Sequence, residues 1–212
     1  MLELGFKALI AYLLGSVIGS LLLGQLKGVD IRTQGSGNAG GTNALRTQGW
    51  GFALGVILID VGKALLAVGW LPSADLPALH PDPAVDRDWL AVACATAVVA
   101  GHVYPVWYEF RGGKGAATLV GTVLVLAPLA LVPIVGVWLL TVMLTGYVGL
   151  GTMLASATLP VYFAFTAPGR TAFLVFGVMM AAFIVYTHRS NVRRMRTGNE
   201  NRARRLWLLR PR

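Results

Sequence analysis

The chain has 212 residues, of which 56% are hydrophobic and only 13% are charged, a balance that excludes an ordinary water-soluble domain. Several apolar stretches have the roughly 17 to 25 residues that cross a bilayer as a helix, so we expect an all-α integral membrane protein. The net charge is +9, but nine of the 18 basic residues lie in the last 24 positions, directly after an apolar stretch. That placement indicates an orientation in the membrane rather than binding to nucleic acid.

The first apolar stretch covers residues 8–26. A secretory signal peptide would have a basic segment before it, but only Lys7 stands there, and Glu3 offsets its charge. We therefore interpret the stretch as a retained membrane helix. The loop that follows, 27–49, carries three basic residues against one acidic residue, which predicts a cytoplasmic loop under the positive-inside rule.

The next two spans are expected at residues 50–71 and 89–108. The loop between them has four aspartates against one arginine, which predicts that it lies outside the cytoplasm. After the third span Arg111 and Lys114 outweigh Glu109, so we expect the chain to return to the cytoplasmic side.

An even number of crossings must follow Lys114, because the basic tail is also predicted to be cytoplasmic. Four short spans fit, with breaks expected at 128–133, 146–151 and 166–170. The sequence thus predicts about seven transmembrane helices, several of them short, with the N-terminus outside and the C-terminus cytoplasmic. We expect a single membrane-embedded domain over residues 1–212, of which 189–212 form a basic cytoplasmic tail.

Polar residues gather in three clusters, which this orientation places on the cytoplasmic side. The first is a glycine-rich loop at 35–46 that also carries hydroxyl and amide side chains and ends in Arg46. Glycines let the backbone aim several N–H groups at one ligand, and arginine adds positive charge, a combination suited to phosphate. A flexible loop of ordinary turn residues is the alternative.

The second cluster, 112–118, has Lys114 among three glycines and leads directly into an apolar helix. A glycine turn with a lysine at a helix N-terminus is again suited to phosphate. It is not a Walker A loop, because Gly115 follows the lysine where serine or threonine is required. A nucleotide hydrolase is therefore disfavoured, and a plain positive-inside loop remains the alternative.

The third cluster begins at Thr187 and His188 and continues through Asn191 to Glu200. On a helix His188 and Asn191 are three residues apart and share a face. Alone, this segment would indicate only a solvated basic helix end. Beside the other two clusters, it favours a ligand-binding role.

Four further residues lie inside apolar spans. Asp60 and Lys63 are spaced i, i+3, for which we expect a buried ion pair within the helix. His102 is equally compatible with a hydrogen-bonded core residue and with a ligand-facing one. Cys94 is interpreted as a small core residue. The sequence contains no spacing typical of metal ligands and no nucleophilic serine motif, so we expect no metal and no cofactor.

From the residues alone, two functional classes remain. One is an enzyme that acts on a phosphorylated substrate. The other is a transporter for phosphate or an organic anion, in which short, glycine-broken helices would surround a polar centre near the middle of the membrane. All three clusters instead end spans on one predicted side, which favours the enzyme.

Several stretches resemble motifs of a known family, the PlsY-type acyl-phosphate:glycerol-3-phosphate acyltransferases of bacteria. Residues 35–46 are similar to its GSGNxGxTNxxR motif, 101–105 and 112–118 to its GHxxP and GGKGxAT motifs, and 188–200 to its HRxNxxRxxxGxE ending. The segment 147–152 departs from the family, which tends to have serines there.

The resemblance implies a membrane acyltransferase that moves a fatty acyl group from acyl-phosphate to the 1-hydroxyl of glycerol 3-phosphate. The products would be 1-acylglycerol 3-phosphate (lysophosphatidic acid) and phosphate, in the first step of phospholipid synthesis. The enzyme would lie in the bacterial inner membrane with its active site on the cytoplasmic side. Its partners would be both substrates, membrane lipids and, transiently, the enzyme that produces acyl-phosphate, with no nucleic acid.

The residues expected to take part in the reaction are Ser36, Arg46, Lys114 and His188. Those expected to bind the substrates are Gly37, Asn38, Gly40, Thr42, Asn43, His102, Gly112, Gly113, Gly115, Thr118 and Asn191. Acyl-phosphate is already activated, so the site must mainly align the acceptor hydroxyl and stabilise developing negative charge. The general base stays open among His188, His102 and a substrate phosphate.

Overall fold

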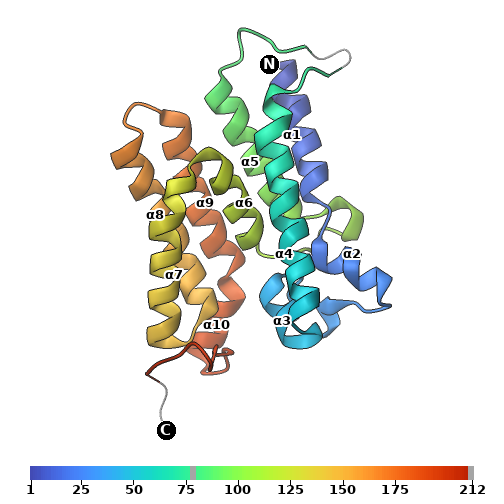
Figure 1. The fold of residues 1–212 in the computed structure, drawn as a ribbon, viewed down its shortest axis with the longest axis vertical. Helices are drawn as coiled ribbons and strands as arrows, with labels where there is room; N and C mark the ends of the chain where they lie inside the picture. The colour runs from blue at the N-terminus through green and yellow to red at the C-terminus, as the bar shows by residue number, and fades with distance from the viewer. Residues whose placement is uncertain (77–79, 210–212) are drawn as a thin grey trace. The chain divides into compact units, whose positions relative to one another are not determined.

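The computed structural model describes residues 1–76 and 80–209, and the regular elements in these ranges are helical (Figure 1). The α-helices are α1 (Leu2–Gly15), α2 (Gly19–Leu26), α3 (Gly41–Gln48), α4 (Trp50–Leu65), α5 (Arg87–Val103), α6 (Ala116–Leu126), α7 (Leu131–Thr145), α8 (Val148–Thr166), α9 (Thr171–Thr187) and α10 (Arg189–Arg196). Short turns of π or 3-10 geometry extend α4 through Leu66–Trp70 and Leu71–Ser73.

Within the part of the chain that the structure describes, four helical segments are long and apolar enough to cross a membrane: Trp50–Ser73, Arg87–Tyr108, Pro128–Thr145 and Val148–Thr166. The count rises to six if each of two bent pairs, α1 with α2 and α9 with α10, forms one span. Helix α6 has 11 residues, or about 17 Å of helix, which is short of the roughly 30 Å of hydrocarbon. The all-α membrane class is confirmed, while the count of seven and the orientation of the termini stay predictions.

The helices form two compact units, Met1–Leu126 and Ala127–Arg212, which are considered separately. The first unit contains α1 to α6 and the polar clusters at 35–46 and 112–118. The second contains α7 to α10 and the third cluster. The expectation of a single domain over residues 1–212 stays a prediction.

Helices of the first unit approach each other closely where glycines face the contact. A Cβ atom on Gly15 of α1 would overlap the backbone of Val98 on α5, and one on Gly101 would overlap the carbonyl oxygen of Tyr12. Helices α4 and α6 meet similarly at Gly121, where a Cβ would lie 2.8 Å from a backbone oxygen of α4. Such small residues allow membrane helices to pack backbone against backbone.

The first span differs from its predicted bounds of 8–26. The helix begins at Leu2 and stops at Gly15, and α2 starts at Gly19 in a direction bent by 44°. The side chain of Lys63 on α4 donates to carbonyl oxygens at the break, at 2.8 Å for Gly15 and 2.7 Å for Val17. The hydrophobic pattern along the chain does not show this break. The lysine that donates to the free carbonyl oxygens there is 48 residues from Gly15.

The helix breaks after α6 agree with the predicted ones to within a few residues. Helix α6 ends at Leu126 and α7 begins at Leu131, and α8 ends at Thr166 before α9 begins at Thr171. The break predicted at 146–151 is narrower than expected, since α8 resumes at Val148. It centres on Gly146, whose φ of +76° is the left-handed conformation that glycine favours.

Two glycines inside α8 serve close contacts instead of ending the helix. A Cβ on Gly149 would lie 2.7 Å from the amide nitrogen of Asn191 on α10. A Cβ on Gly151 would lie 3.2 Å from the carbonyl oxygen of Trp138 on α7. Helix α8 continues through both glycines and has 19 residues, which is longer than the short helix predicted there.

The segment after α10 folds back onto the turn between α7 and α8. The guanidinium carbon of Arg202 lies 4.5 Å from the ring centroid of Tyr147 and 4.1 Å from that of Trp207. Arg202 also donates to the Tyr147 hydroxyl at 2.8 Å, and the indole nitrogen of Trp207 donates to the carbonyl oxygen of Leu144 at 3.1 Å. We call residues 202–208 the C-terminal clasp.

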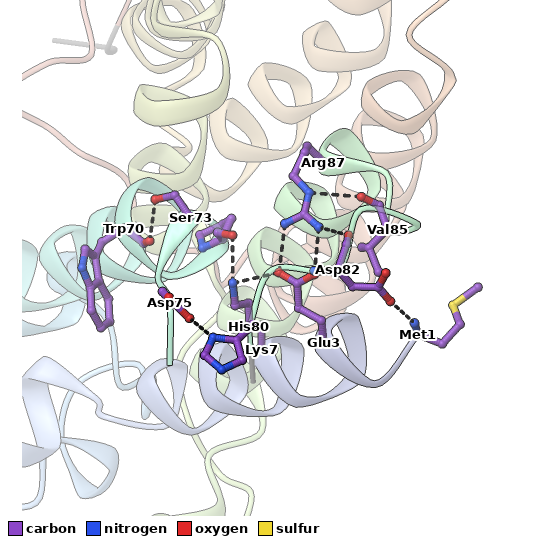
Figure 2. Close-up of polar contacts among 11 residues, drawn as sticks. Met1, Glu3, Lys7, Trp70, Ser73, Asp75, His80, Asp82, Val85 and Arg87 are labelled. Carbon is purple, nitrogen blue, oxygen red and sulfur yellow. Dashed lines mark hydrogen bonds and ion pairs between the residues drawn. The ribbon is translucent and has the colours of Figure 1, made fainter. Parts of the chain in front are cut away.

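Charged side chains form a connected group near the N-terminus of the first unit (Figure 2). Glu3 accepts hydrogen bonds from Lys7 at 2.9 Å, from Arg87 at 2.9 and 2.8 Å, and from the backbone N–H of Asp82 at 2.8 Å. Lys7 also donates to the carbonyl oxygen of Pro72 at 2.9 Å. The side chains of Glu3 and Lys7 are buried. This N-terminal cluster ties the start of α1 to the segment between α4 and α5.

Candidate active site

The first polar cluster forms a loop that is folded onto the short helix α3. Asn43 of α3 is 1% exposed, and its amide nitrogen donates to the carbonyl oxygens of Gln34 at 3.0 Å and Ile31 at 3.2 Å. Its amide oxygen accepts from the backbone N–H of Ser36 at 2.9 Å. The substrate contact of Asn43 stays a prediction, and these three bonds give the residue a role in shaping the loop.

Two glycines give this first loop its bends. Gly35 and Gly37 have φ values of +56° and +72°, in the left-handed region that favours glycine. Gly40 precedes α3, whose first N–H groups have no partner within the helix and so add donors. Thr42 and Arg46 on α3 are exposed, while Ser36 and Asn38 are partly exposed. One loop and one helix thus present hydroxyl, amide and guanidinium groups.

The second polar cluster follows an unusual turn. Glu109 and Phe110 both have φ values of +58°, which is uncommon for residues other than glycine. The turn sends the chain back along the end of α5, where the backbone N–H of Gly113 donates to the carbonyl oxygen of His102 at 3.0 Å. The glycine loop is therefore anchored to the helix that precedes it.

Lys114 stands between this turn and the first turn of α6. Gly115, with φ +87°, leads the chain into the helix, which begins at Ala116. Lys114 therefore adjoins the N-terminal N–H groups of α6, the arrangement that suits an anion. Thr118, one of the predicted substrate-binding residues, is fully buried on this turn.

The two loops lie against each other at one end of the first unit. Arg32, which precedes the first loop, donates to the carbonyl oxygens of Tyr108 and Arg111, which precede the second loop, each at 3.3 Å. A Cβ on Gly113 would lie 3.0 Å from the carbonyl oxygen of Ala39, so the loops touch without an intervening side chain. In Figure 1, α2 and α3 lie near the end of α4 that is far from the N-terminus of the chain. This agrees with the prediction that both clusters share one side of the protein.

Asp30 holds Arg32 in its bridging position. Its carboxylate accepts from Nη2 of Arg32 at 2.8 Å, from Nε at 3.1 Å and from the backbone N–H at 2.9 Å. Hydrogen bonds from the guanidinium lower the pKa of Asp30, and hydrogen bonds to the carboxylate raise the pKa of Arg32. From the sequence, Arg32 counted only as one of the three basic residues of the loop 27–49. The Asp-x-Arg spacing ahead of the glycine loop was the available signal.

His102 lies beneath the second loop and is 2% exposed. Its Nδ1 is 2.9 Å from Nζ of Lys63, which is 3.2 Å from Oδ1 of Asp60. The predicted ion pair of Asp60 and Lys63 is therefore confirmed, and His102 adjoins it. A Cβ on Gly113 would overlap Nε2 of His102, so the ring touches the loop backbone. The substrate contact of His102 stays a prediction.

The third cluster is in the second unit, where α9 meets α10. Nδ1 of His188 is 2.8 Å from the carbonyl oxygen of Ile184. The amide nitrogen of Asn191 donates to Glu200 at 2.7 Å, and Arg194 donates to the second oxygen of Glu200 at 2.7 Å. Glu200 thus orients the amide of Asn191, a role that sequence analysis did not assign.

No group of three or more metal-ligating side chains lies together in residues 1–76 and 80–209. The chemistry that the described residues offer is that of backbone amides, hydroxyls, amides, imidazoles and cations. Together with the helices, these groups define an all-helical membrane protein with two adjoining, cationic glycine loops suited to phosphorylated ligands.

Comparisons with known proteins agree with this class. The chain matches the family described as glycerol-3-phosphate acyltransferase over residues 6–198. Relatives named glycerol-3-phosphate acyltransferase include one from Chlorobaculum parvum, 38% identical over 91% of this chain and 93% of the relative, and one from Chlorobaculum tepidum, 37% identical with the same coverage.

A crystal structure of PlsY (YgiH), an integral membrane glycerol 3-phosphate acyltransferase in its glycerol 3-phosphate form, is also similar. The TM-score is 0.79 at 33% identity, with 94% of each chain covered. The lysophosphatidic acid form of PlsY gives a TM-score of 0.77. This chain belongs to the glycerol-3-phosphate acyltransferase family, which confirms the resemblance seen in its motifs and makes it an acyltransferase.

Proposed function

We propose that this protein transfers a fatty acyl group from acyl-phosphate to the 1-hydroxyl of glycerol 3-phosphate, giving 1-acylglycerol 3-phosphate and phosphate. The contact between the two glycine loops, which carry Arg46 and Lys114, supports this proposal because the reaction brings two phosphate groups together. The similar structures are described as glycerol 3-phosphate and lysophosphatidic acid forms, that is, with the acceptor and the product. The transporter alternative is not favoured by family membership.

The reaction needs little activation by the protein. Acyl-phosphate is a mixed anhydride, so the acceptor oxygen bonds to the acyl carbon, the bond from that carbon to the phosphate oxygen breaks, and phosphate leaves. Holding both substrates in line replaces a collision in solution by a reaction within one complex. Groups that donate to the developing negative charge lower the barrier further.

The predicted residues of the two loops and of the second unit have roles in this scheme. Arg46 offers a forked donor and Lys114 a point charge to the phosphates, and Ser36 adds a hydroxyl donor. The remaining loop residues would bind through backbone or side-chain donors: Gly37, Asn38, Gly40, Thr42, Asn43, Gly112, Gly113, Gly115 and Thr118. Asn191 and His188 of the second unit are proposed to contact the acceptor.

A substrate phosphate is our preferred general base. His102 is 2% exposed and its Nδ1 is engaged by Lys63, which makes it poorly suited to accept a proton from substrate. A phosphate monoester has a second pKa of about 6, so it accepts a proton near neutral pH. His188 would then orient the hydroxyl without serving as the base.

We place the enzyme in the bacterial inner membrane, with its two glycine loops on the cytoplasmic side. The positive charge of both loops supports this orientation. The acyl chain of the donor would enter from the bilayer, while glycerol 3-phosphate would arrive from the aqueous side. Transient contact with the enzyme that produces acyl-phosphate would shorten the path of this reactive donor.

One assay tests the proposal. Purified protein in detergent is given acyl-phosphate and glycerol 3-phosphate, without nucleotide and with a chelator present. We expect 1-acylglycerol 3-phosphate and phosphate in equal amounts, with the position of the acyl group determined by NMR. Parallel reactions with acyl-CoA as donor and with glycerol as acceptor should give little product. Turnover of acyl-CoA without turnover of acyl-phosphate would refute the proposed donor.

A further inference from the structure

Three ionisable side chains meet inside the first unit, beneath the two glycine loops. Lys63 on α4 donates to the carbonyl oxygens of Gly15 and Val17 at 2.8 and 2.7 Å and lies 2.9 Å from Nδ1 of His102. Nδ1 of His102 also lies 3.4 Å from Oδ1 of Asp60, so this ring nitrogen contacts both the ammonium and the carboxylate.

Asp60 completes the group on the other side of the break between α1 and α2. Its Oδ1 accepts from the backbone N–H of Gly19 at 3.1 Å and lies 3.2 Å from Nζ of Lys63. The cation thus sits at the carboxyl end of α1 and the anion at the amino end of α2, where each complements the helix dipole. These contacts fix the direction in which α2 leaves toward the first loop.

His102 connects this group of side chains to the second loop. Its carbonyl oxygen accepts from the N–H of Gly113, and its ring fills the space where a Cβ of Gly113 would lie. The carbonyl oxygen of Ala39 borders that same space from the first loop. The side chains of Asp60, Lys63 and His102 are all at least nine-tenths buried, so they lie among protein groups.

A buried ion pair is a costly way to hold a helix bend, because well-packed apolar residues often stabilise a fold as well or better. Burial of three such groups therefore favours a requirement for defined geometry. The backbones that they touch belong to the segments leading into both loops.

We infer that Asp60, Lys63 and His102 are positioning residues, a buried triad that sets the register of the two glycine loops relative to each other. The inference rests on the proposed function, in which those loops hold the two phosphates. In this inference the triad acts on the substrates through the loops that it positions. Its loss should displace loop donors from the reacting groups, and misplacement of about 1 Å can cost on the order of a hundredfold in rate.

The test compares two matched double variants of the full chain in detergent. Asp60→Asn with Lys63→Met removes the triad charges without leaving one buried alone. Glu3→Gln with Lys7→Met makes the same chemical changes in the N-terminal cluster, which is also buried and also in the first unit. We measure kcat, KM for each substrate, the midpoint of thermal unfolding and glycerol 3-phosphate affinity by calorimetry.

We expect the triad variant to lose roughly ten- to a hundredfold in kcat/KM, while the control stays within about twofold of wild type. Assays are made well below both unfolding midpoints, so that only folded protein is compared. A folded triad variant with wild-type kcat/KM would overturn the inference. A control that loses as much activity would overturn it as well, because the effect would then follow from losing any buried ion pair.

If the double variant does not fold, single replacements of His102 provide a second test of the inference. The side-chain amide of asparagine can take the place of Nδ1 and hydrogen-bond to Lys63 or Asp60, whereas leucine cannot. We expect His102→Asn to keep at least about tenfold more kcat/KM than His102→Leu at similar unfolding midpoints. Equal activity of the two would contradict the triad.

The two proposals fail in different ways. Absence of wild-type turnover with acyl-phosphate would refute the proposed function. The triad is judged by the ratio of variant to wild type and by glycerol 3-phosphate affinity, which is measured without any acyl donor.

Discussion

Nδ1 of His188 lies 2.8 Å from the carbonyl oxygen of Ile184, one turn earlier in the second unit. A carbonyl oxygen can only accept, so Nδ1 must carry the proton. In the neutral imidazole, Nε2 is then the accepting nitrogen. This contact orients a histidine that is suited to receive a hydrogen bond from a hydroxyl group.

Replacing His188 separates an orienting role from a basic one. Glutamine can place an amide oxygen near the position of Nε2, while asparagine reaches only the position of Nδ1. If a substrate phosphate is the base, His188→Gln should keep measurable turnover, and His188→Asn and His188→Ala should keep less. Complete loss in His188→Gln, in a folded protein that still binds glycerol 3-phosphate, would favour histidine as the base.

Removing the loop cations should damage the reaction itself. Lys114→Ala and Arg46→Ala should each lower kcat/KM by about a hundredfold or more, because a donor to developing charge is lost. Arg111→Ala, which removes an exposed charge from the same region as Lys114, is the control and should have a small effect. Comparable losses in all three would show that net charge, and not particular contacts, supports activity.

The N-terminal cluster should contribute to stability rather than to activity. Glu3→Gln leaves the ammonium of Lys7, which is 0% exposed, without its carboxylate partner, and the carbonyl oxygen of Pro72 remains as an acceptor. Loss of one member of a buried pair costs about 3 kcal/mol. Thermal unfolding in detergent should show this loss, while Asp82→Asn, at a more exposed carboxylate, should change little. An unchanged midpoint in Glu3→Gln would contradict the stabilising role.

The orientation of the chain can be tested with single cysteines. Arg204→Cys and Ala84→Cys place thiols at exposed positions in the clasp and in the segment before α5. The native Cys94 is buried and should not react. In intact cells an impermeant thiol reagent should label residue 84 and spare residue 204. The opposite pattern would reverse the predicted topology.

The Asp30–Arg32 pair should make stability depend on pH. The pKa of Asp30 is lowered in the folded protein, so its stabilising effect is present above the unfolded pKa of about 4 and is lost as pH falls through the lowered value. The difference in unfolding midpoint between wild type and Asp30→Asn should be constant near neutral pH and should shrink in acid. A difference between the two unfolding midpoints that grows in acid would contradict the lowered pKa of Asp30.

The sequence was sufficient for the membrane class, the three polar clusters and the ion pair of Asp60 and Lys63. Each depends on residues near one another in the chain, such as an apolar run, a glycine loop or an i, i+3 spacing. Helix breaks at prolines and glycines were predictable for the same reason. Gly149 misled the prediction because its role is a contact with Asn191, and an isolated glycine does not show its neighbour in space.

The missed features all depend on contacts between distant residues. The carbonyl oxygens at the bend after α1 accept hydrogen bonds from a lysine on α4. The segments that precede the two glycine loops are joined by Arg32, which lies 76 residues from Tyr108. The partner of Asn191 is Glu200, beyond the end of α10. No periodicity or local motif specifies such pairings, so they become visible only in the folded chain.

The C-terminal clasp has a consequence for how the protein is made. Arg202 follows its partner Tyr147 by 55 residues, so the ribosome synthesises the α7–α8 turn well before the segment that covers it. During that interval two further helices, α9 and α10, are added. Closure of the turn is therefore a late step in biogenesis, and a ribosome stalled before residue 202 would carry α7 and α8 with their connecting turn still uncovered.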